Sequence, residues 1–305
     1  MRPQIEVYKE HIKGDTYCVV TGSSRIPLYH LDKNNVVLMD SGLKGPDTDG
    51  LLKLLEKENL HVRAVLTSHF HYDHTGGHMD LRAKHGSKIY MSLYDAAASS
   101  NYLNLKPVVL SASYRDFLRT KQRIIPTDHL FSHRDKSVEV DGVEFELLPL
   151  PGHAPEHTGF VTPDGIAYLG DAILSENILR KVHMPYCLHC QETLDTKRKI
   201  QNMKYDGYIM AHNGVTDSIY DLAQWNIDNQ MEKVEETASL IDHFMTMEQV
   251  AAAVIMKLGI NDGSVKKIWS ATHNVTAVME YLIDAGRVVY RANNGFIEYI
   301  RKDCL

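Results

Sequence analysis

Apolar residues recur along the chain with two alternating periods, and this alternation predicts a mixed α/β protein. Four early segments carry β-branched or alternating apolar residues between Gly, Asn and Asp, as strands do. They are residues 4–12, 16–22, 26–33 and 34–42. Residues 48–60 then have helical spacing, residues 63–69 return to a buried strand, and strand-then-helix alternation continues after Gly76.

A long helix separates this α/β part from the end of the chain. Residues 218–243 keep helical spacing throughout, and the pattern beyond them changes. We therefore expect a large first domain over residues 1–238 and a small second domain over residues 239–305.

The small second domain has its own pattern of helices followed by strands. Residues 244–259 predict a helix that begins with Thr246 and Gln249 at capping-box spacing. Residues 274–286 carry an apolar stripe typical of a second helix. Residues 287–300 form two apolar segments around an Asn-Asn-Gly turn, which predicts a hairpin. Helices followed by a hairpin resemble a winged helix.

The composition is that of an ordinary globular protein, with 44% apolar and 24% charged residues among 305. A net charge of −6 gives no general attraction to nucleic acid or to an anionic membrane. The first residues lack the apolar core of a signal peptide, and no segment is apolar enough to span a bilayer. Four cysteines in a chain of this length indicate no disulfide framework. We expect a cytoplasmic protein.

Two local clusters have a simple structural interpretation. The basic residues 197–199 lie at helical spacing and are expected on a solvated face. Cys187 and Cys190 form a CxxC pair, but a structural zinc needs a second pair, and Cys18 and Cys304 are isolated. Ordinary thiols are the simpler interpretation than a zinc or redox pair.

The stretch SHFHYDHTGGH places three histidines and one aspartate within six positions, directly after a predicted strand. These residues are His69, His71, Asp73 and His74. A zinc ion needs three or four N, O or S ligands, and one short loop rarely supplies enough for two ions. Three later apolar runs also end in a ligand-type residue, namely His153, Asp171 and His212. Four strands therefore each deliver ligands at a C-terminal end, with glycines beside them.

This ordered set resembles the metallo-β-lactamase superfamily of hydrolases. The resemblance implies an αββα sandwich with a dinuclear metal site along one sheet edge, and it spans His69 to His212. It implies that one metal is held by His69, His71 and His153. It further implies that the second is held by Asp73, His74 and His212, with Asp171 bridging. The alternative is a set of hydrogen-bonded polar residues at strand ends, or one isolated zinc site.

The chemistry that this resemblance implies is metal-assisted hydrolysis. Two zinc ions per chain, or iron or manganese, would share a hydroxide, because metal binding lowers the pKa of water toward about 7. Such a hydroxide attacks ester, thioester, lactone or phosphodiester centres. Asp73 is also the expected catalytic residue that passes the proton to the leaving group. Asp40, at the end of an apolar run, is either a partner that orients a ligating histidine or a plain turn aspartate.

Departures from other branches of the superfamily narrow the substrate. The commonest zinc β-lactamases have arginine at the position of His74 and cysteine at that of Asp171, and flavodiiron proteins have glutamate at that of His71. Large RNA-processing relatives insert a domain between Asp171 and His212. The remaining resemblances are to glyoxalase II, acyl-homoserine lactonases and compact endoribonucleases. Leu174 stands where the lactonases carry tyrosine, which argues against a lactone.

We expect a small ester or thioester as substrate, with RNA or another phosphodiester as the second choice, because the chain is acidic. A non-catalytic winged-helix binding module is the alternative from another class, but its mark would be a missing ligand, and none is missing. Five residues near the ligands either touch substrate or lie on the surface. They are Tyr72, Arg180, Lys181, His183 and Tyr186.

The second domain is not expected to bind DNA. From Leu240 to Leu305, seven basic residues are matched by seven acidic ones, so the positive charge that neutralises phosphates is absent. The candidate recognition helix, residues 274–286, contains neither arginine nor lysine. We expect this domain to cover the flank of the first domain, to help form a homodimer, or to wall the substrate cleft.

Overall fold

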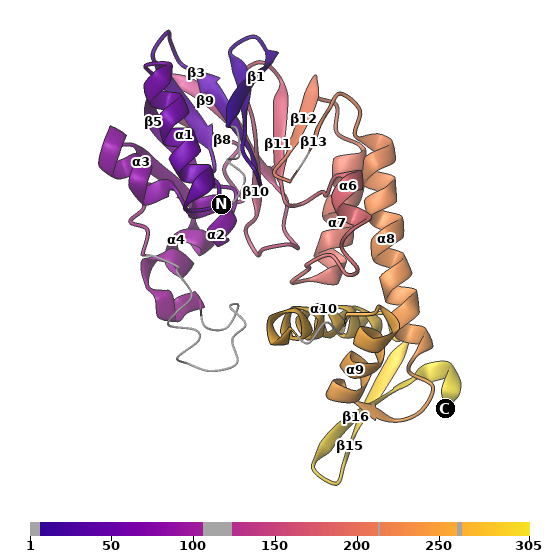
Figure 1. The fold of residues 1–305 in the computed structure, drawn as a ribbon. Coiled ribbons are helices and arrows are strands. Elements are labelled where there is room, and N and C mark those ends of the chain that lie inside the picture. Colours follow the sequence, from indigo (N-terminus) through magenta and orange to yellow (C-terminus); the bar gives the residue numbers. More distant parts are fainter. Residues whose placement is uncertain (1–6, 106–123, 213, 261–263) are drawn as a thin grey trace.

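The computed structural model describes residues 7–105, 124–212, 214–260 and 264–305, and two mixed β-sheets form its centre (Figure 1). The first sheet has the order β1-β2-β3-β4-β5-β6-β7, antiparallel up to β4 and parallel from β4 to β7. Its strands are β1 (Tyr8–Lys13), β2 (Thr16–Val20), β3 (Arg25–His30), β4 (Asn35–Met39), β5 (His61–Leu66), β6 (Lys88–Ser92) and β7 (His129–Phe131). The strands expected within residues 4–42 and 63–69 are confirmed wherever these residues are described.

The second sheet has the order β13-β12-β11-β10-β9-β8, and only β11 and β12 pair in parallel among its described strands. Its strands are β8 (Ser137–Val140), β9 (Val143–Pro149), β10 (Thr158–Val161), β11 (Ile166–Gly170), β12 (Gly207–Met210) and β13 (Gly214–Thr216). Large apolar side chains fill the space between the sheets, among them Met39, Leu66, Phe145, Phe160 and Tyr168. Both sheets are therefore buried on their inner face.

Helices cover the outer faces of the two sheets, which makes four layers (Figure 1). Leu51 and Leu55 of α1 (Pro46–Lys57) and Leu81 of α3 (His78–His85) pack with Val36 and Leu38 on one side. On the other side, Ile200 of α7 (Cys190–Gln201) and Ala223 of α8 (Tyr220–Ser239) pack on the second sheet. Shorter helical segments lie in the connections. They are α2 (Tyr72–Thr75), α4 (Leu93–Ser100), η1 (Tyr102–Leu105) and α6 (Glu176–Leu179).

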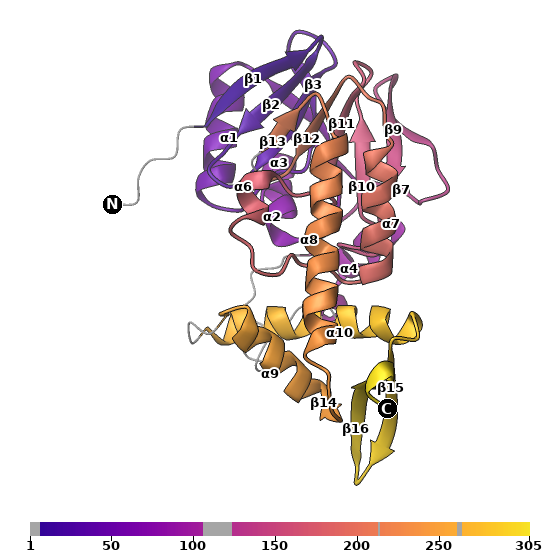
Figure 2. The same cartoon turned by 90° about the vertical axis from the view of Figure 1, so that its right-hand side faces the viewer.

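Helix α8 runs from the sandwich to a small C-terminal unit, as Figure 2 shows. This unit contains α9 (Met247–Lys257), α10 (Val265–Asp284) and a three-stranded sheet of order β14-β16-β15. The strands are β14 (Met245–Thr246), β15 (Val288–Asn293) and β16 (Phe296–Arg301), and η2 (Lys302–Cys304) follows. The predicted capping box of Thr246 and Gln249 is present. Asn294 and Gly295 both have positive φ, which the two-residue hairpin turn requires.

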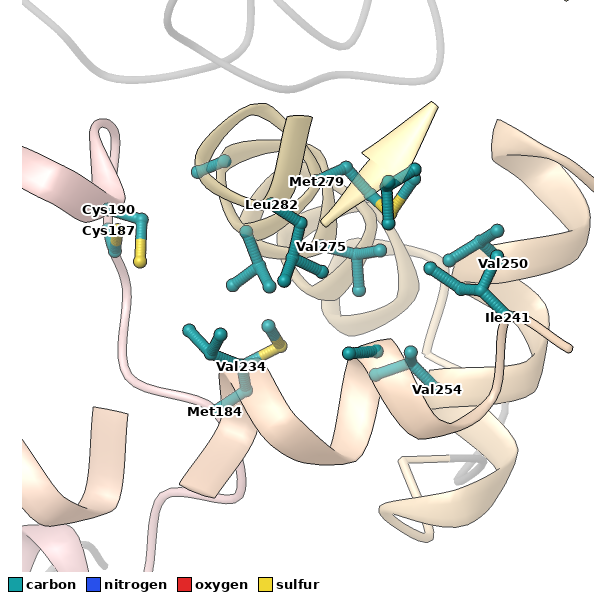
Figure 3. Packing of buried hydrophobic residues seen from close by; sticks show 14 of the residues in the cluster. Met184, Cys187, Cys190, Val234, Ile241, Val250, Val254, Val275, Met279 and Leu282 are labelled. Atoms are coloured by element: carbon teal, nitrogen blue, oxygen red, sulfur yellow. The ribbon is translucent and has the colours of Figure 1, made fainter. Parts of the chain in front are cut away.

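The packing joins the small unit to the sandwich through an apolar cluster (Figure 3). Val275 and Leu282 of α10 and Val234 of α8 meet Cys187 and Cys190 there. Helix α8 ends at Ser239, close to the expected boundary at 238/239, but the division into two domains and the winged-helix name stay predictions. Among the described residues, no helix is long and apolar enough to cross a membrane.

The structure corrects the interpretation of residues 197–199 as a solvated face. Lys197 is buried, with 4% of its surface exposed, while Arg198 pairs with Asp195 on the surface. Lys197 lies on the same stripe of α7 as the buried Cys190, Thr193 and Ile200, three or four positions apart. The pattern of burial along the helix thus places an ammonium group in the interior.

Candidate metal centre

The seven predicted ligands lie together at one edge of the sandwich. The parallel strands β4 and β5 are followed by Asp40 and by the histidine-rich stretch, and the parallel strands β11 and β12 by Asp171 and His212. A backbone hydrogen bond of 2.7 Å from Arg25 N to Ala211 O joins the two sheets there. The ligand atoms form three groups, and within each group all atoms lie within 4.8 Å of one another. They are His69, His71 and His153; His69, His74 and Asp171; and Asp73, His74 and His212.

Three imidazole nitrogens converge in the first group. Nε2 of His69 lies 2.9 Å and Nε2 of His153 lies 3.0 Å from Nδ1 of His71. Ligands of one tetrahedral zinc ion, each at about 2.0–2.1 Å, are separated by roughly 3.3 Å. The two observed distances are a few tenths of an ångström shorter and lie within the hydrogen-bond range, so the three nitrogens converge closely enough to face a single ion.

Carboxylates and imidazoles alternate in the second group. Oδ2 of Asp171 lies 3.3 Å from His74 Nε2 and 3.5 Å from His153 Nε2, so this oxygen faces both groups. Oδ1 of Asp171 lies 3.4 Å from His212 Nε2, and Asp73 Oδ2 lies 3.5 Å from the same nitrogen. Asp171 thus occupies the position that bridges the two groups.

Unpaired atoms show that these residues fit a metal better than a hydrogen-bond network. Nε2 of His74 and Oδ1 of Asp171 are buried and make no aligned hydrogen bond within the described part of the chain. Buried polar atoms are otherwise nearly always paired. Neutral imidazoles and carboxylates are donors that suit zinc, iron or manganese. The residues present therefore fit a metal site, while the identity of the metal and the share of each ion stay predictions.

Asp40 orients one of these histidines. Asp40 directly follows β4, is 1% exposed, and has a backbone φ of 67°. Its Oδ2 accepts hydrogen bonds from His74 Nδ1 at 2.7 Å and from Tyr168 OH at 2.6 Å, and Ser68 donates to both of its oxygens. Asp40 is therefore the partner of a candidate ligand and not a plain turn aspartate.

His157 is a residue of the site that the sequence did not single out. It is fully buried, and its Nε2 accepts a hydrogen bond of 3.1 Å from the backbone N–H of Asp171. Burial and the neighbouring His74 lower the pKa of His157 to about 4 against the opposing influence of Asp171, so the ring is neutral and its Nε2 can accept. A Cβ at Gly170 would lie 2.6 Å from this nitrogen, and Gly170 has φ +52°, so glycine is required there.

The charge states of the ligands differ between the two groups. Burial and then His153 lower the pKa of His71 to about 3, and burial lowers that of His153 to about 4. Burial also acts on His212, but the carboxylates of Asp171 and Asp73, which lie close to its Nε2, outweigh it and raise its pKa to about 10. Without metal, the three-histidine group is neutral at pH 7, whereas His212 carries a proton.

One of the five residues expected near substrate does lie against the ligands. The ring centroid of Tyr186 is 5.4 Å from that of His71 and 5.1 Å from that of His153, and it stacks on His273 of α10 at 5.7 Å. Asn274 holds the adjacent backbone, because it accepts from Cys187 N at 3.2 Å and donates to Met184 O at 3.3 Å. The small C-terminal unit therefore supports a wall of the site.

The other expected residues are less closely engaged. Arg180, Lys181 and His183 are exposed, and Arg180 pairs with Glu176. Tyr72 is half-buried in α2. Cys187 and Cys190 are buried free thiols, which agrees with their simple interpretation.

A cavity of about 210 Å³ opens beside the candidate ligands. His153, Asp171 and His212 form one side of it. Ala172, Leu174, Ile178, Val182 and Pro185 supply apolar walls, and Tyr186, Thr193, Lys197 and Asn226 complete the lining.

Comparison with known proteins identifies the family. The model of the metallo-beta-lactamase superfamily matches residues 28–212, more than half of the chain. A hydroxyacylglutathione hydrolase, GloC, of Haemophilus influenzae is 28% identical over 49% of this chain and 66% of its own length. A probable metallo-hydrolase of Streptococcus pyogenes is 30% identical over 58% of this chain and 70% of its own. The chain spans between 41% and 66% of the first hydroxyacylglutathione hydrolases it matches.

Solved structures agree on the fold. A metallo-beta-lactamase family protein of Thermus thermophilus superposes with a TM-score of 0.68 at 20% identity, over 98% of this chain and 99% of that one. A beta-lactamase domain protein of Burkholderia ambifaria gives 0.68 at 15% identity, over 99% of this chain and 92% of that one. The fold expectation is thus confirmed for the sandwich with two mixed sheets. With its His/Asp metal-site clusters, the chain belongs to the metallo-beta-lactamase superfamily, as a metal-dependent hydrolase.

Proposed function

We propose that this protein hydrolyses small acyl thioesters at a dinuclear metal site. The observation that carries the proposal is the cavity of about 210 Å³ with apolar walls, which reaches the candidate ligands Asp171 and His212. A space of this size suits a short acyl group, not a polymer. Distant relatives named hydroxyacylglutathione hydrolase support a thioester as the scissile bond.

The side chains have distinct tasks in this proposal. When bound, two zinc ions supply Lewis acidity that activates water near neutral pH and polarises the carbonyl oxygen. Asp73 works beside them: burial opposes its ionisation, but His212 and His74 hold the pKa of this carboxylate well below its usual value. This low pKa keeps Asp73 ionised, so it would hold a proton only transiently. With 42% of its side chain exposed, it can accept the proton that the attacking water gives up and pass it to the departing sulfur. Tyr186 confines the acyl group on the opposite side.

Phosphodiester hydrolysis is the second candidate. A groove of about 440 Å³ lies between the segment Lys181–Met184 and α10, and Lys181, His183 and Lys267 line it. The two lysines of this groove suit a phosphate backbone. We rank it second because seven acidic residues balance the seven basic ones from Leu240 to Leu305.

A substrate panel on zinc-loaded protein tests this ranking. We expect hydrolysis of S-acyl glutathione thioesters at rates well above those for oxygen esters, lactones, bis(p-nitrophenyl) phosphate and single-stranded RNA. Asp171→Ala should lose metal and activity together, whereas Asp217→Ala, which changes an exposed aspartate, should lose neither. Turnover of RNA but not of thioesters would reverse the ranking. Intact substrates across the panel, with fewer than two metals per chain, would overturn the dinuclear hydrolase altogether.

A further inference from the structure

The buried Lys197 has no anionic partner among the described residues. Its Nζ donates hydrogen bonds to Asn226 O at 3.3 Å and to Gln230 Oε1 at 3.4 Å, both on α8. Both acceptors are neutral, both distances are at the long end of the hydrogen-bond range, and an ammonium group has three donors. The arrangement leaves the charge poorly compensated.

Burial of such a charge is costly. An ion taken out of water without a counter-ion is strongly destabilised, even after relaxation of its surroundings. Burial lowers the pKa of Lys197 to about 8, with the nearby thiols Cys187 and Cys190 acting in the opposite direction. The side chain is therefore still mostly protonated at pH 7. A neutral methionine of similar length would fit the same position between the two helices at less cost.

The position of Lys197 beside the cavity would allow its charge to interact with a bound ligand. Lys197 lines the cavity beside the candidate metal ligands, together with Thr193 and Asn226. This polar part differs from the apolar walls around Leu174 and Ile178. A ligand in the cavity thus meets the metal ligands, an apolar wall and a cationic group.

We propose that Lys197 binds a carboxylate carried by the acyl group of the substrate. The inference rests on the proposed thioester hydrolysis and narrows its substrate class to acyl groups with an acidic end. The scissile carbonyl lies at Asp171 and His212, the methylene chain lies along the apolar wall, and the carboxylate pairs with Nζ of Lys197. This pair supplies the counter-ion that the described residues do not provide there.

A thiolate is the competing counter-ion. Gln230 donates to Cys190 Sγ at 3.7 Å and accepts from Lys197, and Thr193 donates to Cys187 Sγ at 3.6 Å. Figure 3 shows the two cysteines side by side at the margin of the apolar cluster. Neither sulfur lines the cavity. A lysine that served only to balance a thiolate would have no effect on the choice of acyl group.

Matched acyl pairs on the same thiol test the proposal. We compare glutaryl with pentanoyl and adipoyl with hexanoyl thioesters of glutathione, using kcat/KM on metal-loaded protein. The wild type should prefer the acidic member of at least one pair by about tenfold or more, the size expected of one charge-assisted hydrogen bond. Lys197→Met should abolish this preference while it changes the rate on the neutral member less than about threefold. Lys204→Met, an exposed lysine beyond the same helix, should leave both rates unchanged.

Two further measurements separate the possible failures. The double variant Cys187→Ser/Cys190→Ser should keep the preference for the acidic acyl group. Loss of this preference in the double variant would show that Lys197 acts as the counter-ion of a thiolate and would overturn the proposal. Calorimetric binding of free glutarate against free pentanoate needs no turnover, and wild-type protein should bind glutarate at least about tenfold more tightly. Glutarate binding without any thioesterase activity would refute the proposed function alone. Equal affinity for both acids, or equal loss of both substrates in Lys197→Met, would refute the role of Lys197.

Discussion

The carboxylate of Asp40 accepts a hydrogen bond of 2.7 Å from Nδ1 of His74, and the opposite nitrogen of this imidazole faces Asp171 at 3.3 Å. The contact fixes the ring orientation and keeps the proton on Nδ1, so Nε2 is the nitrogen turned toward the candidate metal site. Tyr168 donates to the same oxygen from inside the sandwich. The position of the ligand is therefore tied to the core of the fold.

Asp40→Asn should weaken the second metal site. The amide keeps the shape and tolerates the left-handed φ of 67°, but it removes the charge that holds the His74 proton. We expect metal affinity and activity to fall by about 10–100-fold. Metal analysis after dialysis, together with thioester turnover, measures this. Tyr168→Phe is the matched control, because it removes another hydrogen bond to the same oxygen and leaves the imidazole contact; an equal effect of both variants would contradict the assignment.

Metal binding should release protons at the second group but not at the first. His71 and His153 have pKa values of about 3 and about 4, so they are already neutral at pH 7. His212, with a pKa of about 10, must lose its proton before it can bind an ion. His74 must lose one too, because Asp171 and Asp40 outweigh the effect of burial and hold its pKa well above the usual value. The affinity for the second ion should thus rise by at least about tenfold per pH unit between about pH 6 and 9. Calorimetry of metal-free protein in buffers of different ionisation enthalpy should show one proton-independent and one proton-releasing step; two proton-independent steps would refute this.

The gathering of the candidate ligands at one edge could be predicted from the sequence, because His69, Asp171 and His212 each stand just beyond the end of a strand. Their role as metal ligands stays a prediction. The role of Asp40 could not be predicted in this way, because only the 2.7 Å contact separates an orienting carboxylate from a turn aspartate. His157 was missed for a related reason: it acts on the backbone of Asp171, fourteen positions away, and no motif records such a bond.

Lys197 shows how local charge misled the prediction. Three consecutive basic residues suggested a solvated face, yet helical spacing from Cys190 and Thr193 puts one of them on the buried side. The spacing of buried positions along the helix predicted the burial of Lys197 better than its charge did. The large first sheet and the terminal hairpin were predictable for the same reason, since their patterns are strictly periodic or carry a turn signal.

Removal of the Asn274 amide should loosen the wall of the site. Asn274→Leu keeps the volume but leaves the buried Cys187 N–H and Met184 C=O without partners, which costs about 1–3 kcal/mol. Because Tyr186 lies in this segment, KM should rise several-fold, up to about tenfold, with metal content unchanged. Thr272→Ala on the same helix, whose hydroxyl bonds within α10, should leave KM unaffected. A normal KM for Asn274→Leu would show that α10 does not position the segment.

Asp95 should make the stability of the fold depend on pH. This fully buried carboxyl accepts a hydrogen bond of 3.0 Å from the backbone N–H of Phe70, the residue between the candidate ligands His69 and His71. Burial raises the pKa of Asp95 from 3.8 to about 8. Between these values the folded chain holds a proton that the unfolded chain has lost. Its contribution to stability is thus fully present below about pH 4 and declines until about pH 8.

Asp95→Asn removes this titration while an oxygen remains available for Phe70 N. We expect the variant to gain stability relative to the wild type at about pH 9 compared with about pH 5. With a folded-state pKa of about 8, the wild type loses about 1.4 kcal/mol of stability for each pH unit between about pH 5 and pH 8, so the gain should exceed about 1 kcal/mol. Urea unfolding of metal-free protein at both pH values measures the difference. Asp80→Asn is the control, since that partly exposed aspartate pairs with Lys44 on the surface and should show no such gain. Parallel stability curves for Asp95→Asn and the wild type would mean that Asp95 is ionised in the folded protein.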